Sequence, residues 1–212
     1  MAGSANPNSP NNSTLASRSW IREISKLLFQ HHVQNGQLID GFENDIQSIL
    51  QTHNLCYGPQ KYCDRIWRKF IFGYSEHTAV EKMDGKIQSL ILGRDVVLVV
   101  HGGNSDLQFL ARLRISIRPI HILGTQKAAQ TPLQLTYRPS LESFLTTFQI
   151  PFVRRSLHIA GNDANYALRT LLMIAVRCSE QEEGLNCRQR IYFKVLQALA
   201  QSPPPPLDEN CI

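Results

Sequence analysis

His158 and Asp163, five positions apart, are the pair of side chains in this sequence best suited to chemistry. An imidazole titrates near neutral pH and can deprotonate a water molecule, while a neighbouring carboxylate can hold a divalent ion that orients the water. This combination suits phosphodiester hydrolysis. The pair lies just before residues 166–176, whose apolar side chains recur at helical spacing and predict a buried helix.

The same stretch has a simpler interpretation as the polar start of that helix. The residues between the pair include Ala160, Gly161 and Asn162, which are too small and polar to be expected in the core. In this interpretation Asn162 or Asp163 is the N-cap. The spacing of His158 and Asp163 alone does not decide between the two interpretations.

A second candidate segment lies upstream, where an apolar strand ends in a glycine turn. Residues 95–101 (DVVLVVH) have the length and β-branched content of a central strand covered on both faces. Asp106 closes the turn, and a helical spacing follows at Leu107, Phe109, Leu110 and Leu113. Such strand ends form the ligand crevice of open α/β sheets, although Asp106 is equally suited to be a helix N-cap.

Together these segments resemble the DEDDh group of 3′-to-5′ exonucleases with the ribonuclease H fold, which includes the DNA polymerase III proofreading subunit and RNase T. The second motif of that group is an apolar strand followed by a histidine or asparagine turn and an aspartate, here VVHGGNSD ending at Asp106. The third motif, H-x-A-x-x-D-A, is matched by HIAGNDA at residues 158–164. The resemblance implies that His158, Asp163 and Asp106 are catalytic, with Asp106 and Asp163 as ligands of Mg²⁺ or Mn²⁺.

Two further segments make the resemblance closest to a fungal branch of exonuclease-like proteins. That branch carries F-x-F-G-x-S-E before the second motif, matched here by FIFGYSE at residues 70–76. Its strand I-L-D-T-Q after the second motif is matched by ILGTQ at residues 122–126. The four segments extend over about residues 50–178. Their order implies an α/β fold, a ribonuclease-H-like mixed central sheet flanked by helices.

The first motif of the family, a D-x-E at the start of the sheet, is not found upstream of Phe70. The nearest candidates, Asp40 and Glu43, have one residue too many between them, and strand alternation would aim them at opposite faces. Gly124 replaces an aspartate of the family, and Ile159 replaces an asparagine. The first strand is therefore predicted to be altered or missing.

The missing carboxylates bear on catalysis, because two metal ions about 4 Å apart repel each other unless several acids surround them. Asp106 and Asp163 could hold one Mg²⁺ or Mn²⁺ weakly, with water filling most of its shell. The chain is then a degenerate relative or lacks its first strand in the sequence as given. Residues 1–19 are rich in Asn, Ser, Ala and Pro, which fits both explanations and predicts a disordered leader.

The length of 212 residues predicts one domain, residues 20–201, between that leader and a Pro-rich tail at residues 202–212. The sequence has no run of 18 apolar residues, and its polar N-terminus lacks the apolar region of a signal peptide. These features predict a cytoplasmic or nuclear protein without a membrane partner. The five cysteines are odd in number and scattered, which favours reduced structural roles over metal binding.

The net charge of +5 is moderate, but its basic residues gather near the motifs. Basic residues interleaved with aromatic ones suit single-stranded nucleic acid, with phosphates on Arg and Lys and bases stacked on rings. The alternative is a solvated surface with Trp67 and Phe70 in the core. The predicted nucleic-acid contacts are His101, Asn104, Arg154 and Arg155. Further basic clusters are Lys61, Arg65, Arg68 and Lys69 around Trp67, and Arg112, Arg114 and Arg118 after the second motif.

Periodicity and capping signals predict the remaining elements. Ser140 is the expected N-cap of a helix at residues 141–148. Residues 127–139 carry no periodic pattern and predict a loop. The alternation of strands and helices predicts an α/β sheet. The other predicted elements are helices at 42–50, 78–92 and 185–201, a strand at 119–123, and a helix or strand at 20–28.

Three functions are compatible with these residues: an active metal-dependent exonuclease on RNA or DNA, a degenerate exonuclease-like domain, and a purely structural domain. The missing carboxylates count against the first, and the intact His158 and Asp163 count against the third. We therefore favour a degenerate domain that binds single-stranded nucleic acid or a protein partner, with weak or no nuclease activity.

Overall fold

The computed structural model describes residues 33–34, 37–38 and 52–205. The predicted leader, the segments 20–28 and 42–50, and the candidate acids Asp40 and Glu43 lie outside the described residues. The end of the Pro-rich tail, residues 206–212, lies outside them too. Within the described part, no helix has the length and apolar character needed to cross a membrane.

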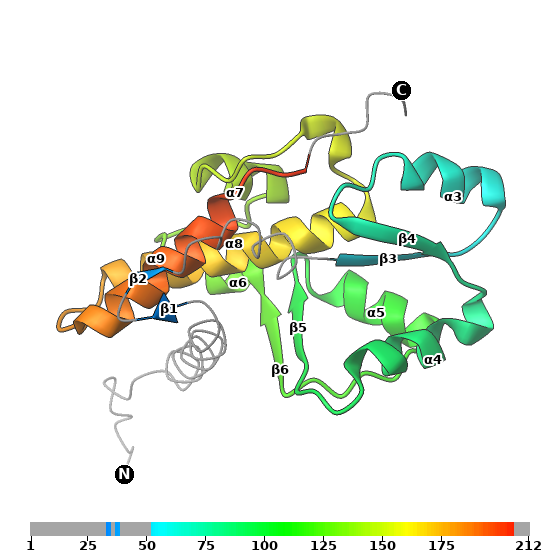
Figure 1. Cartoon of the computed structure of the whole chain (residues 1–212), viewed down its shortest axis with the longest axis horizontal. Coiled ribbons are helices and arrows are strands. Elements are labelled where there is room, and N and C mark those ends of the chain that lie inside the picture. The colour runs from blue at the N-terminus through cyan, green and yellow to red at the C-terminus, as the bar shows by residue number, and fades with distance from the viewer. Residues whose placement is uncertain (1–32, 35–36, 39–51, 206–212) are drawn as a thin grey trace, which may run out of the picture.

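The described strands form three two-stranded pairs, of which two are parallel (Figure 1). A parallel pair needs a crossover connection, and here each connection contains a helix, α3 in the first pair and α5 in the second. Helix α4 links the two pairs. The parallel pairs are β3 (Thr52–Cys56) with β4 (Gly73–His77) and β5 (Val97–Val100) with β6 (His121–Gly124), and the antiparallel pair is β1 (Val33–Gln34) with β2 (Gln37–Leu38). The helices among them are α3 (Gln60–Trp67), α4 (Val80–Ile91) and α5 (Asn104–Arg112).

The predicted α/β class is confirmed, with short parallel sheets flanked by helices. The sheet expected at the centre is present, among the described residues, as separate pairs. The expectation that the strand at residues 95–101, observed as β5, is covered on both faces is wrong, because Val97, Leu98 and Val99 are only half-buried. Ile122, the register partner of Leu98, is 53% exposed. A two-stranded sheet has few neighbours, so its strands keep more exposure than a central strand would.

Helix α8 (Ala160–Glu180) is the centre of the core. Its buried side chains include Tyr166, Leu172 and Ile174, which share the main apolar region with Phe144 and Leu199 of neighbouring helices. The helix packs on β3 and β5 as well as on α9, beside which it runs in Figure 1. The predicted helices at 166–176, 141–148 and 185–201 are confirmed as α8, α7 and α9. The bounds of the neighbouring helices are α6 (Thr125–Ala128), α7 (Leu141–Thr147) and α9 (Cys187–Gln201).

Local capping signals fix where two of these helices begin. The Oγ of Ser140 accepts a hydrogen bond of 3.1 Å from the backbone N–H of Ser143, which confirms the predicted N-cap of α7. Helix α9 starts with a capping box, in which Asn186 and Gln189 each bind the other's backbone N–H at 2.9 Å. Each cap satisfies backbone donors that a helix start leaves without partners.

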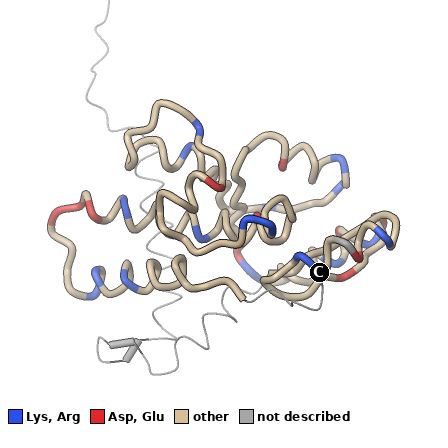
Figure 2. The backbone as a smooth tube through the Cα atoms, turned by 90° about the horizontal axis from the view of Figure 1, so that it is seen from above, with Lys and Arg blue, Asp and Glu red and all other residues tan. Residues whose placement is uncertain are grey.

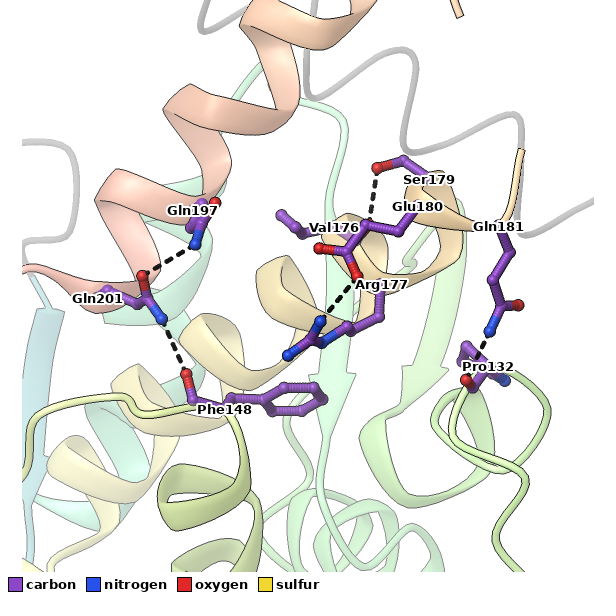
Figure 3. Close-up of polar contacts among 9 residues, drawn as sticks. All are labelled: Pro132, Phe148, Val176, Arg177, Ser179, Glu180, Gln181, Gln197 and Gln201. Carbon is purple, nitrogen blue, oxygen red and sulfur yellow. Dashed lines mark hydrogen bonds and ion pairs between the residues drawn. The ribbon is translucent and has the colours of Figure 1, made fainter. Parts of the chain in front are cut away.

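The C-terminal ends of α8 and α9 are tied to the chain before α8 (Figure 3). Gln201, the last residue of α9, donates from Nε2 to the carbonyl oxygen of Phe148 at 3.0 Å. Gln181, directly after α8, donates from Nε2 to the carbonyl oxygen of Pro132 at 2.9 Å. Pro132 belongs to the predicted loop 127–139, whose first two residues are the end of the short α6. These bonds hold the segments on either side of α7 against the two long helices.

A buried arginine joins α8 to the end of α9 and to β3. Arg169 is 1% exposed and donates from Nε to Oδ1 of Asn165 at 2.8 Å and from Nη1 to the carbonyl oxygen of Ser202 at 2.5 Å. Asn165 in turn donates to Oγ1 of Thr52 at 2.9 Å. The guanidinium lies 5.0 Å from the ring centroid of Phe72, and its burial lowers the pKa of Arg169 to about 10. Among the described residues no carboxylate forms an ion pair with it, so neutral acceptors and an aromatic face stabilise the charge.

Candidate nucleic-acid interface at the start of α8

The start of α8 is a strained turn that holds His158 and Asp163 together. The N-cap is Ile159, whose side chain accepts no hydrogen bond, and His158 before it has a φ of 64°. That left-handed conformation costs a non-glycine residue about 1 kcal/mol. Oδ1 of Asp163 accepts the backbone N–H of His158 at 3.1 Å, and a carboxylate in the first turn also suits the helix dipole. The predicted N-cap at Asn162 or Asp163 is therefore wrong, because Asp163 closes the turn from inside the helix.

The charge of His158 acts on the Asp163 carboxyl. His158 is exposed and Asp163 is half-buried. Burial raises the pKa of the Asp163 carboxyl, while the N–H of His158 and the charge of its imidazole act in the opposite direction. One carboxylate oxygen is committed to the turn, and no hydrogen bond from the described residues reaches the other. The geometry places an exposed base beside a carboxylate that has one oxygen left for a ligand.

Gly161 and Asn162 lie in the core, which corrects the expectation that this segment is too small and polar to be buried. Asn162 is 0% exposed. Its Nδ2 donates to the carbonyl oxygens of Lys69 at 2.8 Å and Ser156 at 2.7 Å, and its Oδ1 accepts the N–H of Ile71 at 3.1 Å. A side-chain amide can be buried when its donors and its acceptor are all satisfied, as they are here.

The second motif brings Asp106 and His101 close to each other after β5. Asp106 is exposed in the first turn of α5, and the N-cap there is Gly103, not Asp106. Burial lowers the pKa of His101, and the charge of Asp106 partly opposes this effect. His101 places Nδ1 2.8 Å from Oγ1 of Thr125 and meets the ring of Phe144 edge-on at 5.8 Å. Its Nε2 is enclosed near the backbone of Pro139, and no residue in the described part of the chain forms a hydrogen bond of normal geometry with it. Neither ring nitrogen of His101 is therefore exposed.

The third motif lies at the start of α8, and α8 packs on β5, the strand that precedes the second motif. Between described residues, no hydrogen bond or ion pair joins His158 and Asp163 to His101 and Asp106. The described part of the chain also has no group of three or more His, Cys, Asp or Glu side chains arranged to hold a metal ion. A two-metal centre needs several carboxylates, so the described donors by themselves do not fit one.

The end of α3 brings positive charge to the start of α8. Arg68 and Lys69 are exposed, and the Lys69 carbonyl is one of the acceptors of Asn162. In the region that the structure describes, neither side chain has an ion-pair partner. Asn162 lies 93 positions after Lys69, so no local sequence pattern indicated that these residues are neighbours.

A second basic segment, the short 3-10 helix η1 (Arg154–Ser156), directly precedes His158. Arg154 and Arg155 are exposed. Arg154 pairs with Glu142 at 2.9 Å, but its side chain is 83% exposed and such a pair is weak in water. Asn104, the first residue of α5, is exposed as well. The predicted contacts Asn104, Arg154 and Arg155 are therefore accessible to a ligand, and their binding roles stay predictions.

The positive charge of the chain is not confined to this region. Figure 2 shows Lys and Arg in several separate stretches of the backbone. What distinguishes the start of α8 is the amide of Asn162, which holds two basic segments beside one motif. The contacts of Asn162, more than the net charge, define the candidate interface.

The fold and this site define an α/β domain that carries the second and third motifs of a DEDDh-type exonuclease. The family model described as DEDDh_C, DNA polymerase III subunit epsilon-like, C-terminal domain, matches residues 30–174. Because this match covers more than half of the 212 residues, the chain belongs to that family. Comparisons with curated proteins and with solved structures gave no match.

Membership confirms the predicted DEDDh exonuclease-like domain and supports a function related to nucleic-acid exonucleases. The matched residues include Asp40 and Glu43 as well as Asp106, His158 and Asp163. The fungal branch and the loss of the first motif stay predictions.

Proposed function

We propose that this chain is a degenerate DEDDh exonuclease-like domain that binds single-stranded nucleic acid at the start of α8, with weak or no nuclease activity. The observation that carries the proposal is the position of Asn162, which holds two basic segments beside His158 and Asp163. Arg and Lys side chains bind phosphates and release the counterions condensed on them. The proposed contacts are Arg68, Lys69, Asn104, Arg154 and Arg155.

The donor set supports weak or no cleavage. The family uses divalent metal ions, which activate the attacking water and stabilise the charge of the leaving oxygen. Asp106 and Asp163 are the carboxylates of the two recognised motifs, and one oxygen of Asp163 is committed to the backbone of His158. Two acids can hold one Mg²⁺ or Mn²⁺ weakly. A second ion needs further acids, for which Asp40 and Glu43 are the candidates in the matched region.

An active 3′-to-5′ exonuclease is the second candidate, and the retained pair favours it. His158 is exposed, and its charge acts on Asp163. An exposed imidazole can take a proton from water, and a neighbouring carboxylate can hold the protonated ring in place. This pairing is what a general base of the family requires, so the two candidates differ in the number of acids and not in the base.

Binding is tested with short single-stranded RNA and DNA labelled at the 3′ end and followed by fluorescence anisotropy in EDTA. We expect weak binding at low salt, further weakened in a double variant carrying Arg154→Ala and Arg155→Ala. Arg177→Ala is the matched control, because Arg177 is exposed in the last turn of α8 and pairs only locally with Glu180. If neither oligonucleotide binds at low salt, the nucleic-acid function fails and a protein partner becomes the better explanation.

Cleavage is tested on the same oligonucleotides in Mg²⁺ or Mn²⁺, with products resolved on a gel. We expect trimming far slower than that of an exonuclease with a complete D-x-E motif. Rapid trimming that disappears in Asp163→Asn and His158→Ala would contradict the degenerate assignment. It would then indicate Asp40 and Glu43 as the additional acids, and Asp40→Asn would test that directly.

A further inference from the structure

The β3–β4 pair has one covered face and one open face. On the covered face, Asn54 and Cys56 are 5% and 6% exposed, and Nδ2 of Asn54 donates to Oγ of Ser75 at 2.9 Å. Side chains alternate along a strand, so the residues between these project to the other side. Tyr74 on that side is 74% exposed, the most exposed large aromatic side chain in the described part of the chain. We call this side the open face, and it consists of His53, Leu55, Tyr74 and Glu76.

Tyr74 and His53 lie side by side on the open face. They are register partners in the parallel pair, and neighbouring strands are about 4.8 Å apart. His53 is exposed as well. Among the described residues, neither ring has a hydrogen-bond, ion-pair or ring partner. An exposed ring without a partner offers its face to a planar ligand.

The start of α8 packs against the covered face, near Asn54, and the connection between α3 and β4 leads from there to the open face. Ile71, whose N–H binds Asn162, precedes Tyr74 by three residues, and β4 begins between them at Gly73. At about 3.3 Å per residue, Tyr74 lies at most about 10 Å from that contact. Arg68 and Lys69 lie on the same connection between α3 and β4. One polynucleotide that crosses this connection from one face of the β3–β4 pair to the other could therefore contact these basic residues and the ring of Tyr74 at the same time.

We propose that Tyr74, with His53 beside it, is a base-stacking platform for single-stranded nucleic acid bound at the start of α8. This inference rests on the proposed function and adds a subsite for an unpaired base. The combination of cationic side chains for phosphates with an exposed ring for a base is how proteins bind single strands without reading sequence.

The charges and polarity of the open face favour a nucleic acid over a protein. Its carboxylate, Glu76, pairs with Lys86 of α4 at 2.8 Å, which offsets the negative charge near the ring. The ring of Tyr74 stands beside His53 and Glu76, so the open face has no contiguous apolar patch of the kind that protein partners cover. A single strand needs one exposed ring and nearby cations, both of which are present.

The test is the affinity of a short 3′-labelled single strand, measured by anisotropy in EDTA. Removal of a stacking ring costs about 1–3 kcal/mol, so Tyr74→Ala should weaken binding by about 5- to 150-fold. Tyr74→Phe keeps the ring and should bind like the original chain. Tyr62→Ala is the matched control, because Tyr62 is 60% exposed on α3 and is not part of the open face.

Two further measurements separate stacking from other causes. Stacking releases no counterions, so Tyr74→Ala should keep the salt dependence of binding, and its thermal unfolding should match that of the original chain. In a series of strands with one abasic site each, the strand that lacks the stacked base should lose affinity for the original chain but not for Tyr74→Ala. Unchanged affinity of Tyr74→Ala in a chain that binds nucleic acid overturns the platform and leaves the proposed function standing. Absence of any binding by the original chain overturns both.

Discussion

At the scale of single residues, burial shifts the pKa values of Asp163 and His101 in opposite directions. Acid therefore has opposite effects on stability through these two groups. Burial raises the pKa of Asp163, so its neutral form is favoured in the folded chain and acid favours folding through this group. Burial lowers the pKa of His101, so its neutral form is favoured as well, but acid then favours unfolding. The two contributions oppose each other in acid, and replacement of one group separates them.

We predict that His101 makes the chain less stable in weak acid. Its folded pKa lies below the unfolded value of about 6.5, so the unfolded chain binds the proton more tightly. The stabilisation is present above that value and is lost as the pH falls through it toward the folded pKa. Urea unfolding at neutral pH and in weak acid measures this loss. His101→Gln removes the titration and should reduce the difference between the two conditions, and an unchanged difference would contradict the assignment.

We also predict that Gly161 tolerates no side chain. A Cβ at this position would lie 2.6 Å from Cε2 of Phe70 and 3.0 Å from Cβ of Asn54, so the buried ring would have to move. Gly161→Ala should lower the free energy of unfolding by about 1–3 kcal/mol, as overpacking does. Gly85→Ala in α4 is the matched control, since its Cβ would meet no atom within 4 Å. The control should be neutral or stabilise by up to about 1 kcal/mol, because alanine favours the helix.

At the scale of elements, α8 organises the molecule through polar side chains that are buried in its first three turns. Asn162 holds the end of α3 and η1, and Arg169 with Asn165 holds β3 and the end of α9. These bonds are geometrically specific, so they fix how the neighbouring segments sit on the helix.

Replacement of Arg169 should therefore lower the free energy of unfolding more than replacement of a surface arginine does. Arg169→Met keeps much of the apolar stem but leaves Oδ1 of Asn165 and the carbonyl oxygens of Ala200 and Ser202 without this donor. We expect a loss of about 1–3 kcal/mol in the free energy of unfolding, measured by urea denaturation. Arg177→Met, an exposed position on the same helix, should change it by less than about 0.5 kcal/mol. Equal effects of the two variants would contradict the role given to Arg169.

At the scale of the whole molecule, the net charge of +5 is modest and widely distributed (Figure 2). Affinity for a polyanion therefore depends on how many basic side chains the fold brings to one place. The structure places four exposed ones beside the start of α8, namely Arg68, Lys69, Arg154 and Arg155.

We predict that the salt dependence of binding reports how many of these four basic side chains contact phosphates. Each phosphate contact with a single strand contributes about 0.7 to the slope of log K against log salt, so four contacts give a slope of about −3. Each of Arg68→Ala, Lys69→Ala, Arg154→Ala and Arg155→Ala should reduce the steepness by about 0.7, whereas Arg177→Ala should not. Measurement of affinity over a salt series tests this, and a slope near zero would show that phosphates are not the bound groups.

The sequence by itself determined the α/β class, the main elements and the family. Apolar periodicity predicted α4, α7, α9 and the strand β5 close to their observed bounds, and it predicted only the middle of α8, at residues 166–176. The hydroxyl of Ser140 was correctly expected as an N-cap. These features depend on residues within one or two turns of each other, so the local order of side chains is sufficient to specify them. The order of four motif segments indicated the family, and each of these segments is short enough to be recognised from its local sequence.

Only the tertiary structure decided which polar residues are buried and which charges gather. Asn162 was expected outside the core but is enclosed, because its acceptors are carbonyl groups at Lys69 and Ser156. His101 packs against Phe144 and Thr125, contacts that its local sequence did not indicate, and its predicted contact with nucleic acid stays a prediction. Strands β3 and β4 and the helix α3 had no clear local pattern, and they are positioned by contacts with α8. Such contacts join residues that are distant in the sequence. A local pattern contains no information on which distant groups will meet, so it could not have indicated them.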